Sequence, residues 1–253
     1  MTKNILITGA GSGIGRAIAH TLSGQGYSLI LLGRNLSTLE NTRQALKSPE
    51  THQTFSCDIR QKQQIRAALE KSGIQSLYAV IANAGKGGEN HYSEEEDAWQ
   101  EIIDTNLTGS YYTLNECLPF LKKDAGEFKK VVIVSSILAR LGVPGYSAYC
   151  ASKAGLLGLM RSMASQWSGD KILVNAICPG WVNTDMAQEG LRGFADALQI
   201  SREDAYERAM SQVPLGKMSE PEEIAQLAAF LVSGAQTSFT GQALDINNGA
   251  LMP

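Results

Sequence analysis

Short apolar runs alternate with helical segments along almost the whole chain. The apolar runs lie at residues 4–8, 28–32, 54–58, 76–85, 130–136, 172–178 and 242–247. Helical patterns lie at residues 14–22, 62–73, 99–121, 148–167 and 221–234. Strands that are apolar throughout are buried on both faces. The pattern therefore predicts an α/β fold with a parallel sheet of about seven strands and helices on both faces.

Right-handed crossovers between parallel strands make such a sheet doubly wound, in the Rossmann-like manner, and place ligands at the carboxyl ends of the strands. No repeat, low-complexity tract or Pro-rich linker divides the chain. We therefore predict one domain over residues 1–253. Only residues 185–213 leave the alternation, because charged helical pieces are broken there by glycines.

The composition is that of a globular protein, with 43% hydrophobic and 19% charged residues. A net charge of −3 gives no general attraction to nucleic acid or to an anionic membrane, and the apolar runs are too short to cross a bilayer. Residues 1–8 lead directly into a glycine motif, so we expect no secretory signal. The four cysteines contain no C-x-x-C pair and the three histidines form no zinc pattern. We expect a cytoplasmic protein with buried reduced thiols and no metal.

A glycine-rich turn, TGAGSGIG, follows the first apolar run and opens the first helix. Gly9, Gly13 and Gly15 allow a tight turn and a close backbone approach, with Ser12 and Ile14 in the same turn. The helix that begins there offers free N–H groups and a positive dipole to a pyrophosphate. We interpret the turn as a dinucleotide-binding site; the alternative is a turn without a ligand.

The stretch YSAYCASKAGLLGL places Tyr149 and Lys153 four residues apart, which puts both side chains on one face of a helix. An ammonium beside a phenol favours the phenolate and lowers the pKa of the tyrosine. A tyrosine tuned in this way can exchange a proton with the oxygen of a ketone or alcohol. Tyr146 has Cys150 four residues later, so we expect it to pack or to line the substrate entrance. The alternative for the pair is a surface cation and a packed ring.

Three motifs in order carry a resemblance to a known family. They are G-x-x-x-G-x-G at residues 9–15, N-A-G at 83–85 and Y-x-x-x-K at 149–153. Together they resemble the short-chain dehydrogenase/reductase family, from residue 4 to near the C-terminus. The resemblance implies an NAD(P)-dependent oxidoreductase that interconverts a ketone and a secondary alcohol on a small molecule.

The same resemblance implies three further roles at the reaction centre. Ser136, thirteen residues before Tyr149, would hold the substrate carbonyl oxygen, whereas Ser135 could be a hydrogen bonder at the end of the strand. Asn106 would lie in a helix kink whose carbonyl holds a water bonded to Lys153; the alternative is a solvent-facing asparagine. Lys153 would also hold the nicotinamide ribose.

The resemblance also implies which residues after the strands touch the cofactor. Asn83, Ala84 and Gly85 would lie beneath the ribose and nicotinamide, and Asp58 and Ile59 would lie beside the adenine. The loop that reaches the carboxamide would contain Pro179, Gly180, Val182 and Thr184. Ala82 stands where the family usually has another asparagine.

The end of the second strand predicts NADP(H) in preference to NAD(H). NAD sites of this fold place an acid about 20 residues beyond the glycine turn, but residues 16–39 contain no carboxylate. Gly33 stands in place of the acid and Arg34 follows it, where a guanidinium can pair with a 2′-phosphate. Ser12 occupies a position where some NADP-dependent relatives carry a second basic residue. The alternative is a surface arginine that caps a turn.

Residues 185–213 match the family segment that closes over the substrate as a small helical lid; the alternative is a peripheral helical hairpin. Met186, Leu191, Phe194 and Leu198 give it an apolar inner face, which indicates a substrate with an apolar body. By this segment the chain is most similar to 3-oxoacyl and polyketide ketoreductases, with hydroxybutyrate-type dehydrogenases close behind.

Other functions stay open at this point: an NAD-dependent alcohol or 3-hydroxyacid dehydrogenase, a sugar-nucleotide epimerase or dehydratase, and a non-catalytic dinucleotide sensor. We also expect a homo-oligomer, in particular a homotetramer. Residues 99–121 and 148–167 carry more apolar positions than one sheet-facing stripe needs, and the family pairs these helices across a two-fold axis. The positions in question are Tyr111, Tyr112, Leu156, Leu159 and Met163.

Overall fold

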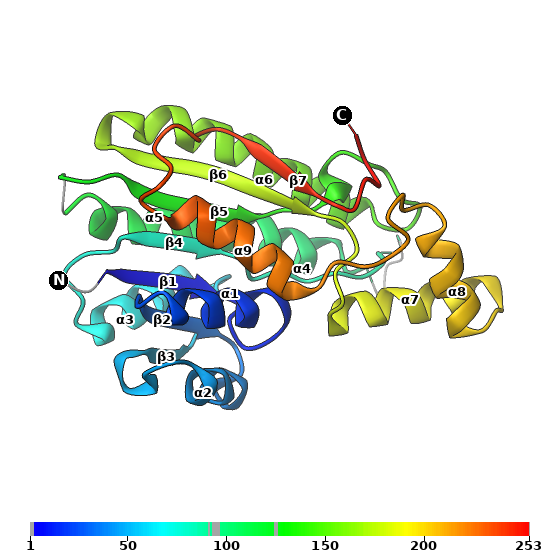
Figure 1. Ribbon diagram of the computed structural model, residues 1–253, viewed down its shortest axis with the longest axis horizontal. Coiled ribbons are helices and arrows are strands. Elements are labelled where there is room, and N and C mark those ends of the chain that lie inside the picture. Colours follow the sequence, from blue (N-terminus) through cyan, green and yellow to red (C-terminus); the bar gives the residue numbers. More distant parts are fainter. Residues whose placement is uncertain (1–2, 91, 93–96, 124–125, 253) are drawn as a thin grey trace.

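A seven-stranded sheet forms the centre of the computed structural model, which describes residues 3–90, 92, 97–123 and 126–252 (Figure 1). Its order is β3-β2-β1-β4-β5-β6-β7, and all neighbouring strands pair in parallel. The strands are β1 Asn4–Thr8, β2 Ser28–Gly33, β3 Gln53–Ser56, β4 Ala79–Ala82, β5 Lys129–Val134, β6 Ile172–Pro179 and β7 Ala243–Ile246. The predicted doubly wound parallel sheet is confirmed.

Helices cover both faces of this sheet (Figure 1). On one face lie α1 Gly13–Gly24, α2 Leu36–Ala45 and α9 Pro221–Val232; on the other lie α3 Lys62–Ser72, α4 Trp99–Ile103, α5 Gly109–Leu121 and α6 Ser147–Trp167. Two further helices, α7 Asp185–Leu198 and α8 Arg202–Met210, project beyond the carboxyl ends of the strands. Two large apolar cores, one on each face, hold the layers together because they remove the inward stripes of these helices from water.

The strand order reverses between β1 and β4. Ile5 pairs with Leu29 on one side and with Ala79 on the other, so the connections that leave the two carboxyl ends run in opposite directions. Such a switch point opens a crevice at the carboxyl edge of a doubly wound sheet. The fold therefore provides a binding site at this edge.

The long helical stretch predicted over residues 99–121 contains a π-helical segment, Asp104–Thr108. The N–H of Gly109 bonds to the carbonyl of Asp104, five residues earlier. A Cβ on Gly109 would lie 2.7 Å from the side chain of Ile59, so this crossing requires glycine. Asn106 lies inside the segment with no exposed surface, as often happens where π-helical turns serve function.

Part of the predicted outward apolar face is wrong. Leu156 and Met163 are buried in the core, at 1% and 4% exposure, because they share the sheet-facing side of α6 with Met160. Tyr111 is 47% exposed, whereas Tyr112 is partly buried against the same core. The unpaired apolar surface of these helices is smaller than the sequence indicated.

No helix in the described part of the chain is long and apolar enough to cross a membrane. All four cysteines are free thiols, and Cys57, Cys117 and Cys178 are buried as expected. Cys150 is only half-buried, because it lies in the first turn of α6 near the surface.

Candidate active site

The residues singled out from the sequence gather along the carboxyl edge of the sheet. They lie in the β1–α1 turn (Gly9, Ser12, Gly13, Ile14, Gly15), after β2 (Gly33, Arg34), after β3 (Asp58, Ile59), after β4 (Asn83, Ala84, Gly85), in the π-helical segment (Asn106), after β5 (Ser136), on α6 (Tyr149, Lys153) and around the end of β6 (Pro179, Gly180, Val182, Thr184). Segments far apart in sequence are thus brought to one edge.

The segment after β4 braces the glycine turn. Thr8 Oγ1 accepts hydrogen bonds from the backbone N–H groups of Asn83 and Ala84, each at 3.0 Å. The side-chain amide of Asn83 donates to the carbonyls of Thr8 and Gly9, at 3.0 and 3.2 Å. Gly9 has a φ of +66°, and a Cβ there would lie 2.8 Å from Ala84. The side chain of Asn83 therefore shapes the turn itself, a role the sequence reasoning did not assign.

The N-terminus of α1 fits a pyrophosphate. The N-cap Ser12 makes no side-chain capping bond and the first turn contains no acidic residue, so free N–H groups and an uncompensated positive dipole end remain. Gly13 has a φ of +48°, and a Cβ there would lie 3.1 Å from the Thr184 side chain. A larger residue at Gly13 would be strained in this backbone conformation and would press against Thr184.

Arg34 is exposed at the end of β2. Within the described residues, no hydrogen bond or ion pair occupies its guanidinium. The nearby carboxylate of Asp58 is bound by Arg60, with Nε 3.0 Å from both oxygens and Nη2 2.6 Å from Oδ2. These bonds keep the pKa of Asp58 below its ordinary value. Because Arg60 compensates this acid, Asp58 opposes an incoming phosphate only weakly.

Arg16 is a second cation at the glycine turn that the sequence reasoning missed. Its Nη2 donates to the carbonyl of Gly11, and its Nε lies 3.3 Å from Thr42 Oγ1. The Thr42 hydroxyl donates in turn to the carbonyl of Ala10 at 3.1 Å. The sequence contained one signal for this role. Ser12 stands where some NADP-dependent relatives carry a basic residue, and Arg16 follows it one helical turn later.

Tyr149, in the first turn of α6, faces Ser136, which follows the carboxyl end of β5. Burial raises the pKa of the phenol to about 12, and a hydrogen bond with the Ser136 side chain acts in the opposite direction. The ammonium of Lys153 lies 5.5 Å from the centre of the Tyr149 ring. The expected lowering of the tyrosine pKa is therefore wrong for the protein alone, because desolvation outweighs the stabilising contacts.

Lys153 is 4% exposed. Its Nζ donates to the carbonyl of Val134 at 3.0 Å, and burial lowers its pKa to about 8. A Cβ on Gly85 would lie 3.4 Å from this nitrogen and 3.3 Å from Asn106 Oδ1. The absence of a side chain at Gly85 keeps the space above the ammonium open.

Asn106 is not a solvent-facing asparagine. Its Oδ1 accepts from the backbone N–H of Lys86 at 2.7 Å, and its Nδ2 donates to the Lys86 carbonyl and to Ser152 Oγ, each at 3.0 Å. Its main-chain carbonyl accepts from Ser110 Oγ at 2.7 Å. The side chain thus ties the segment after β4 to the helix that carries Tyr149.

The two neighbouring serines have separate contacts. Ser136 Oγ accepts from the backbone N–H of Leu138 at 3.1 Å and faces Tyr149. Ser135 Oγ instead donates to the main-chain carbonyl of Lys153 at 2.9 Å and is buried. The hydroxyl beside the phenol is therefore that of Ser136, whereas Ser135 fixes α6 to β5.

Helices α7 and α8 form the segment expected to cover the substrate (Figure 1). Met186 reaches the segment after β4, where a Cβ on Gly87 would lie 3.0 Å from its side chain. Leu191 does not face the substrate side, because it is buried with Met210 and Met218 in a small core that the lid forms with neighbouring parts of the chain. The apolar inner face predicted from the sequence is therefore reduced to Met186, Phe194 and Leu198.

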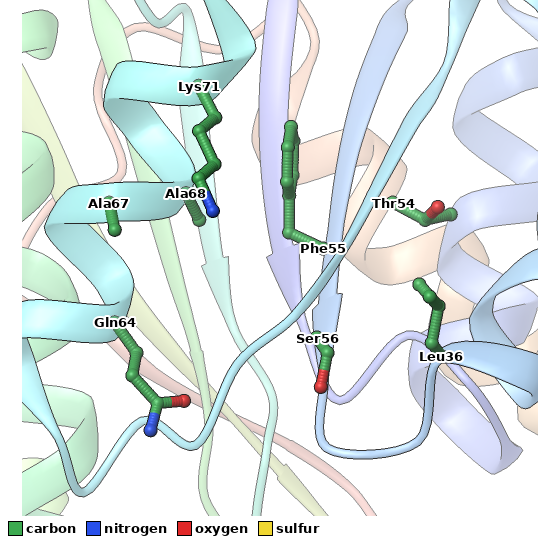
Figure 2. A pocket seen from close by; sticks show the side chains of 8 residues that line it. All are labelled: Leu36, Thr54, Phe55, Ser56, Gln64, Ala67, Ala68 and Lys71. Carbon is green, nitrogen blue, oxygen red and sulfur yellow. The ribbon is translucent and has the colours of Figure 1, made fainter.

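Two surface hollows lie away from the predicted catalytic residues. Figure 2 shows a hollow of about 380 Å³ at the outer edge of β3, lined by Leu36, Thr54, Phe55, Ser56, Gln64, Ala67, Ala68 and Lys71. A second, of about 210 Å³, is lined by Asn183, Gln188, Tyr206, Lys217, Met218 and Glu220. Neither hollow includes Ser136, Tyr149 or Lys153. The candidate active site is therefore defined by the hydrogen bonds and packing of these three residues and not by a hollow.

Comparisons with known proteins give matches over nearly the whole chain. A family described as enoyl-(acyl carrier protein) reductase matches residues 9–250. The 3-oxoacyl-[acyl-carrier-protein] reductase of Rickettsia prowazekii is 33% identical over 251 residues, covering 99% of this chain and 97% of that protein. A putative ketoacyl reductase of Streptomyces coelicolor is 30% identical, covering 96% and 95%. A crystal structure of a variant actinorhodin polyketide ketoreductase with NADPH superimposes with a TM-score of 0.90 at 30% identity, covering 98% and 97%.

Proposed function

This chain belongs to the short-chain dehydrogenase/reductase family, and on that premise we propose that it is an NADPH-dependent ketoreductase. The substrate class that fits best is a 3-oxoacyl thioester, whose ketone becomes a secondary alcohol. One observation carries the proposal: the hydroxyl of Tyr149 meets Ser136 while the buried ammonium of Lys153 lies on the same side of α6.

The cofactor would lie along the carboxyl edge of the sheet. Its pyrophosphate would meet the N–H groups of the α1 N-terminus beyond Gly13, and a 2′-phosphate would meet the exposed guanidinium of Arg34. Lys153 would donate to the ribose, since only one of its three N–H bonds is used by Val134. When bound, the cofactor supplies the hydride that reduces the ketone.

The proton would come from Tyr149. A phenol with a pKa near 12 is fully protonated at neutral pH, which is the form that reduction requires. Ser136 would donate a hydrogen bond to the substrate oxygen and so stabilise the negative charge that develops there. As Tyr149 loses its proton, the ammonium of Lys153 would stabilise the phenolate in a site from which water is excluded.

The lid supports a substrate with an apolar body. Met186 and Leu198 are 43% and 38% exposed on α7, and Phe194 is half-buried. We propose that residues 185–213 close over the substrate and bury these side chains against its acyl chain. The lid and the sheet would then act together as one domain.

The decisive experiment is steady-state reduction of 3-oxoacyl thioesters, cyclic ketones and sugars with NADPH and with NADH. We expect the thioesters to be the best substrates with NADPH. Tyr149→Phe should lower kcat by about 10²–10⁴-fold and leave NADPH binding intact, whereas Tyr146→Phe should keep most of the activity. A preference for NADH would indicate an NAD-dependent dehydrogenase, and tight NADPH binding without turnover of any carbonyl would indicate a dinucleotide sensor.

We also propose a cytoplasmic homotetramer. Trp99 and Tyr111, on α4 and α5, are 40% and 47% exposed, and large exposed aromatic side chains favour contact with a second copy. Free thiols such as Cys57 and Cys117 are typical of a reducing compartment.

A further inference from the structure

The helix that carries Tyr149 has no capping side chain of its own. The N-cap position of α6 is Tyr146, which makes no side-chain capping bond. The first N–H groups of a helix have no partner within it, so an uncapped first turn opens easily. Tyr149 lies in this first turn, three residues after the cap position. The position of its hydroxyl therefore depends on whether this turn stays formed.

A residue from a different part of the chain supplies the missing cap. Asn90 Oδ1 accepts from the backbone N–H of Ala148 at 2.8 Å and from Ser147 Oγ at 3.2 Å. The backbone N–H of Asn90 donates to the carbonyl of Gly145 at 2.7 Å. Because a backbone N–H can only donate, the atom that faces Ala148 is the amide oxygen. Asn90 thus binds both the turn before α6 and the first turn of the helix.

The same segment is fixed at its other end. Lys86 is held through its backbone by the side chain of Asn106, which also bonds to Ser152. Ser152 Oγ donates to the main-chain carbonyl of Tyr149 at 2.8 Å. The backbone around Tyr149 is therefore held on its N-terminal side through Asn90 and on its C-terminal side through Ser152.

We infer that Asn90 is a positioning residue for the proposed proton donor: its side chain caps α6 and holds the Tyr149 hydroxyl beside Ser136. The inference rests on the proposed function as far as turnover is concerned. The capping itself is a property of the folded chain and can be tested without a substrate.

Cys150 gives a direct measure of the first turn. Its backbone N–H makes an α-helical bond to the carbonyl of Tyr146 at 2.8 Å, and it is half-buried while the other three cysteines are buried. Alkylation of the native protein by iodoacetamide should therefore report opening of this turn. Asn90→Ala should increase the alkylation rate of Cys150 about fivefold, the typical effect of a lost cap. Asn90→Asp keeps an oxygen at the same place, so its rate should not exceed that of wild type.

A matched control is Asn35→Ala, which removes an asparagine cap from α2. Asn35 Oδ1 accepts from the backbone N–H groups of Ser37 and Thr38, at 2.9 and 3.3 Å. This variant should lower overall stability by a similar amount and leave the alkylation of Cys150 unchanged. If Cys150 is alkylated in both variants at the wild-type rate, or is alkylated faster in both by the same factor, the capping role of Asn90 is wrong.

Turnover provides the second measurement. Asn90→Ala should lower kcat about fivefold or more with little change in the KM for NADPH, since the cofactor site is untouched. Asn90→Asp should restore kcat, and the carboxylate should shift the alkaline limb of the kcat profile to higher pH because it disfavours a nearby phenolate. If wild type reduces ketones and Asn90→Ala turns over equally fast, the positioning role is wrong and the proposed function stands. If wild type reduces none, the proposed function fails, and the alkylation rates still decide the cap.

Discussion

Replacing Lys153 by methionine should change how the stability of the unliganded protein depends on pH. Burial lowers the pKa of Lys153 from 10.5 to about 8, so the folded protein disfavours the ammonium. Below pH 8 the lysine is charged in both the folded and the unfolded state, and the cost of burying the ammonium lowers the free energy of unfolding in full. This cost falls as the pH rises from 8 to 10.5 and is absent above pH 10.5. This lowering of the pKa from 10.5 to about 8 corresponds to about 3 kcal/mol of lost folding stability at pH 7.

Urea unfolding at pH 7 and pH 9.5 measures this effect. About 2 kcal/mol of the penalty is released over that interval in wild type, whereas Lys153→Met has no charge to release. The free energy of unfolding of wild type should therefore rise by about 2 kcal/mol relative to the variant. Tyr149, with its pKa raised to about 12, contributes little in this window.

The exposed Lys62 provides the control, because Lys62→Met should track wild type at both pH values. If the free energies of unfolding of wild type and Lys153→Met differ by the same amount at pH 7 and at pH 9.5, the assignment of a buried, destabilised cation is refuted. The same variant should lose turnover, since the proposed mechanism needs the charge that the fold disfavours.

Three further outcomes are expected. Arg34→Ala should lower kcat/KM for NADPH about 10- to 100-fold and leave that for NADH nearly unchanged, because only a 2′-phosphate uses the guanidinium; an equal loss with both cofactors would contradict this. Arg140 Nε lies 3.2 Å from Oδ1 of the largely buried carboxylate of Asp245. Arg140→Ala should therefore lower the free energy of unfolding in urea by about 2 kcal/mol, because it leaves this carboxylate without its cation, and the double variant Arg140→Ala/Asp245→Ala should lower it by less. Light scattering should give about four times the 27.2 kDa of one chain, and a monomer at micromolar concentration would overturn the proposed assembly.

The architecture could be predicted because each strand is a continuous apolar run. SLYAVIANAG contained β4, but the strand itself is only Ala79–Ala82. Asn83 and Gly85 leave the sheet because their contacts are with the glycine turn and the space above Lys153. Strand position was therefore readable from hydrophobicity, whereas strand length was decided by tertiary contacts.

The candidate site was readable where chemistry and spacing coincide on one element, as for Tyr149 and Lys153. The direction of the pKa shift of Tyr149 could not be predicted from the sequence. Desolvation depends on how deeply α6 is buried, and no local sequence pattern records that depth. Leu191 and Met163 were misassigned for a similar reason: amphipathic spacing identifies an apolar face without saying what covers it. Asn90 and Arg16 were missed because their partners lie on other elements or across a turn.

The π-helical segment also sets the angular phase of everything that follows it. One surplus residue in a helical turn rotates later positions by about 100° relative to an uninterrupted α-helix. With that surplus in place, Leu114 is buried in the core and Tyr111 is 47% exposed. Loss of a single codon within residues 104–108 would let a regular helix form and would turn Leu114 out of the core. Length changes that surface loops accept should therefore be excluded here, so this stretch should remain constant in length even where its side chains vary.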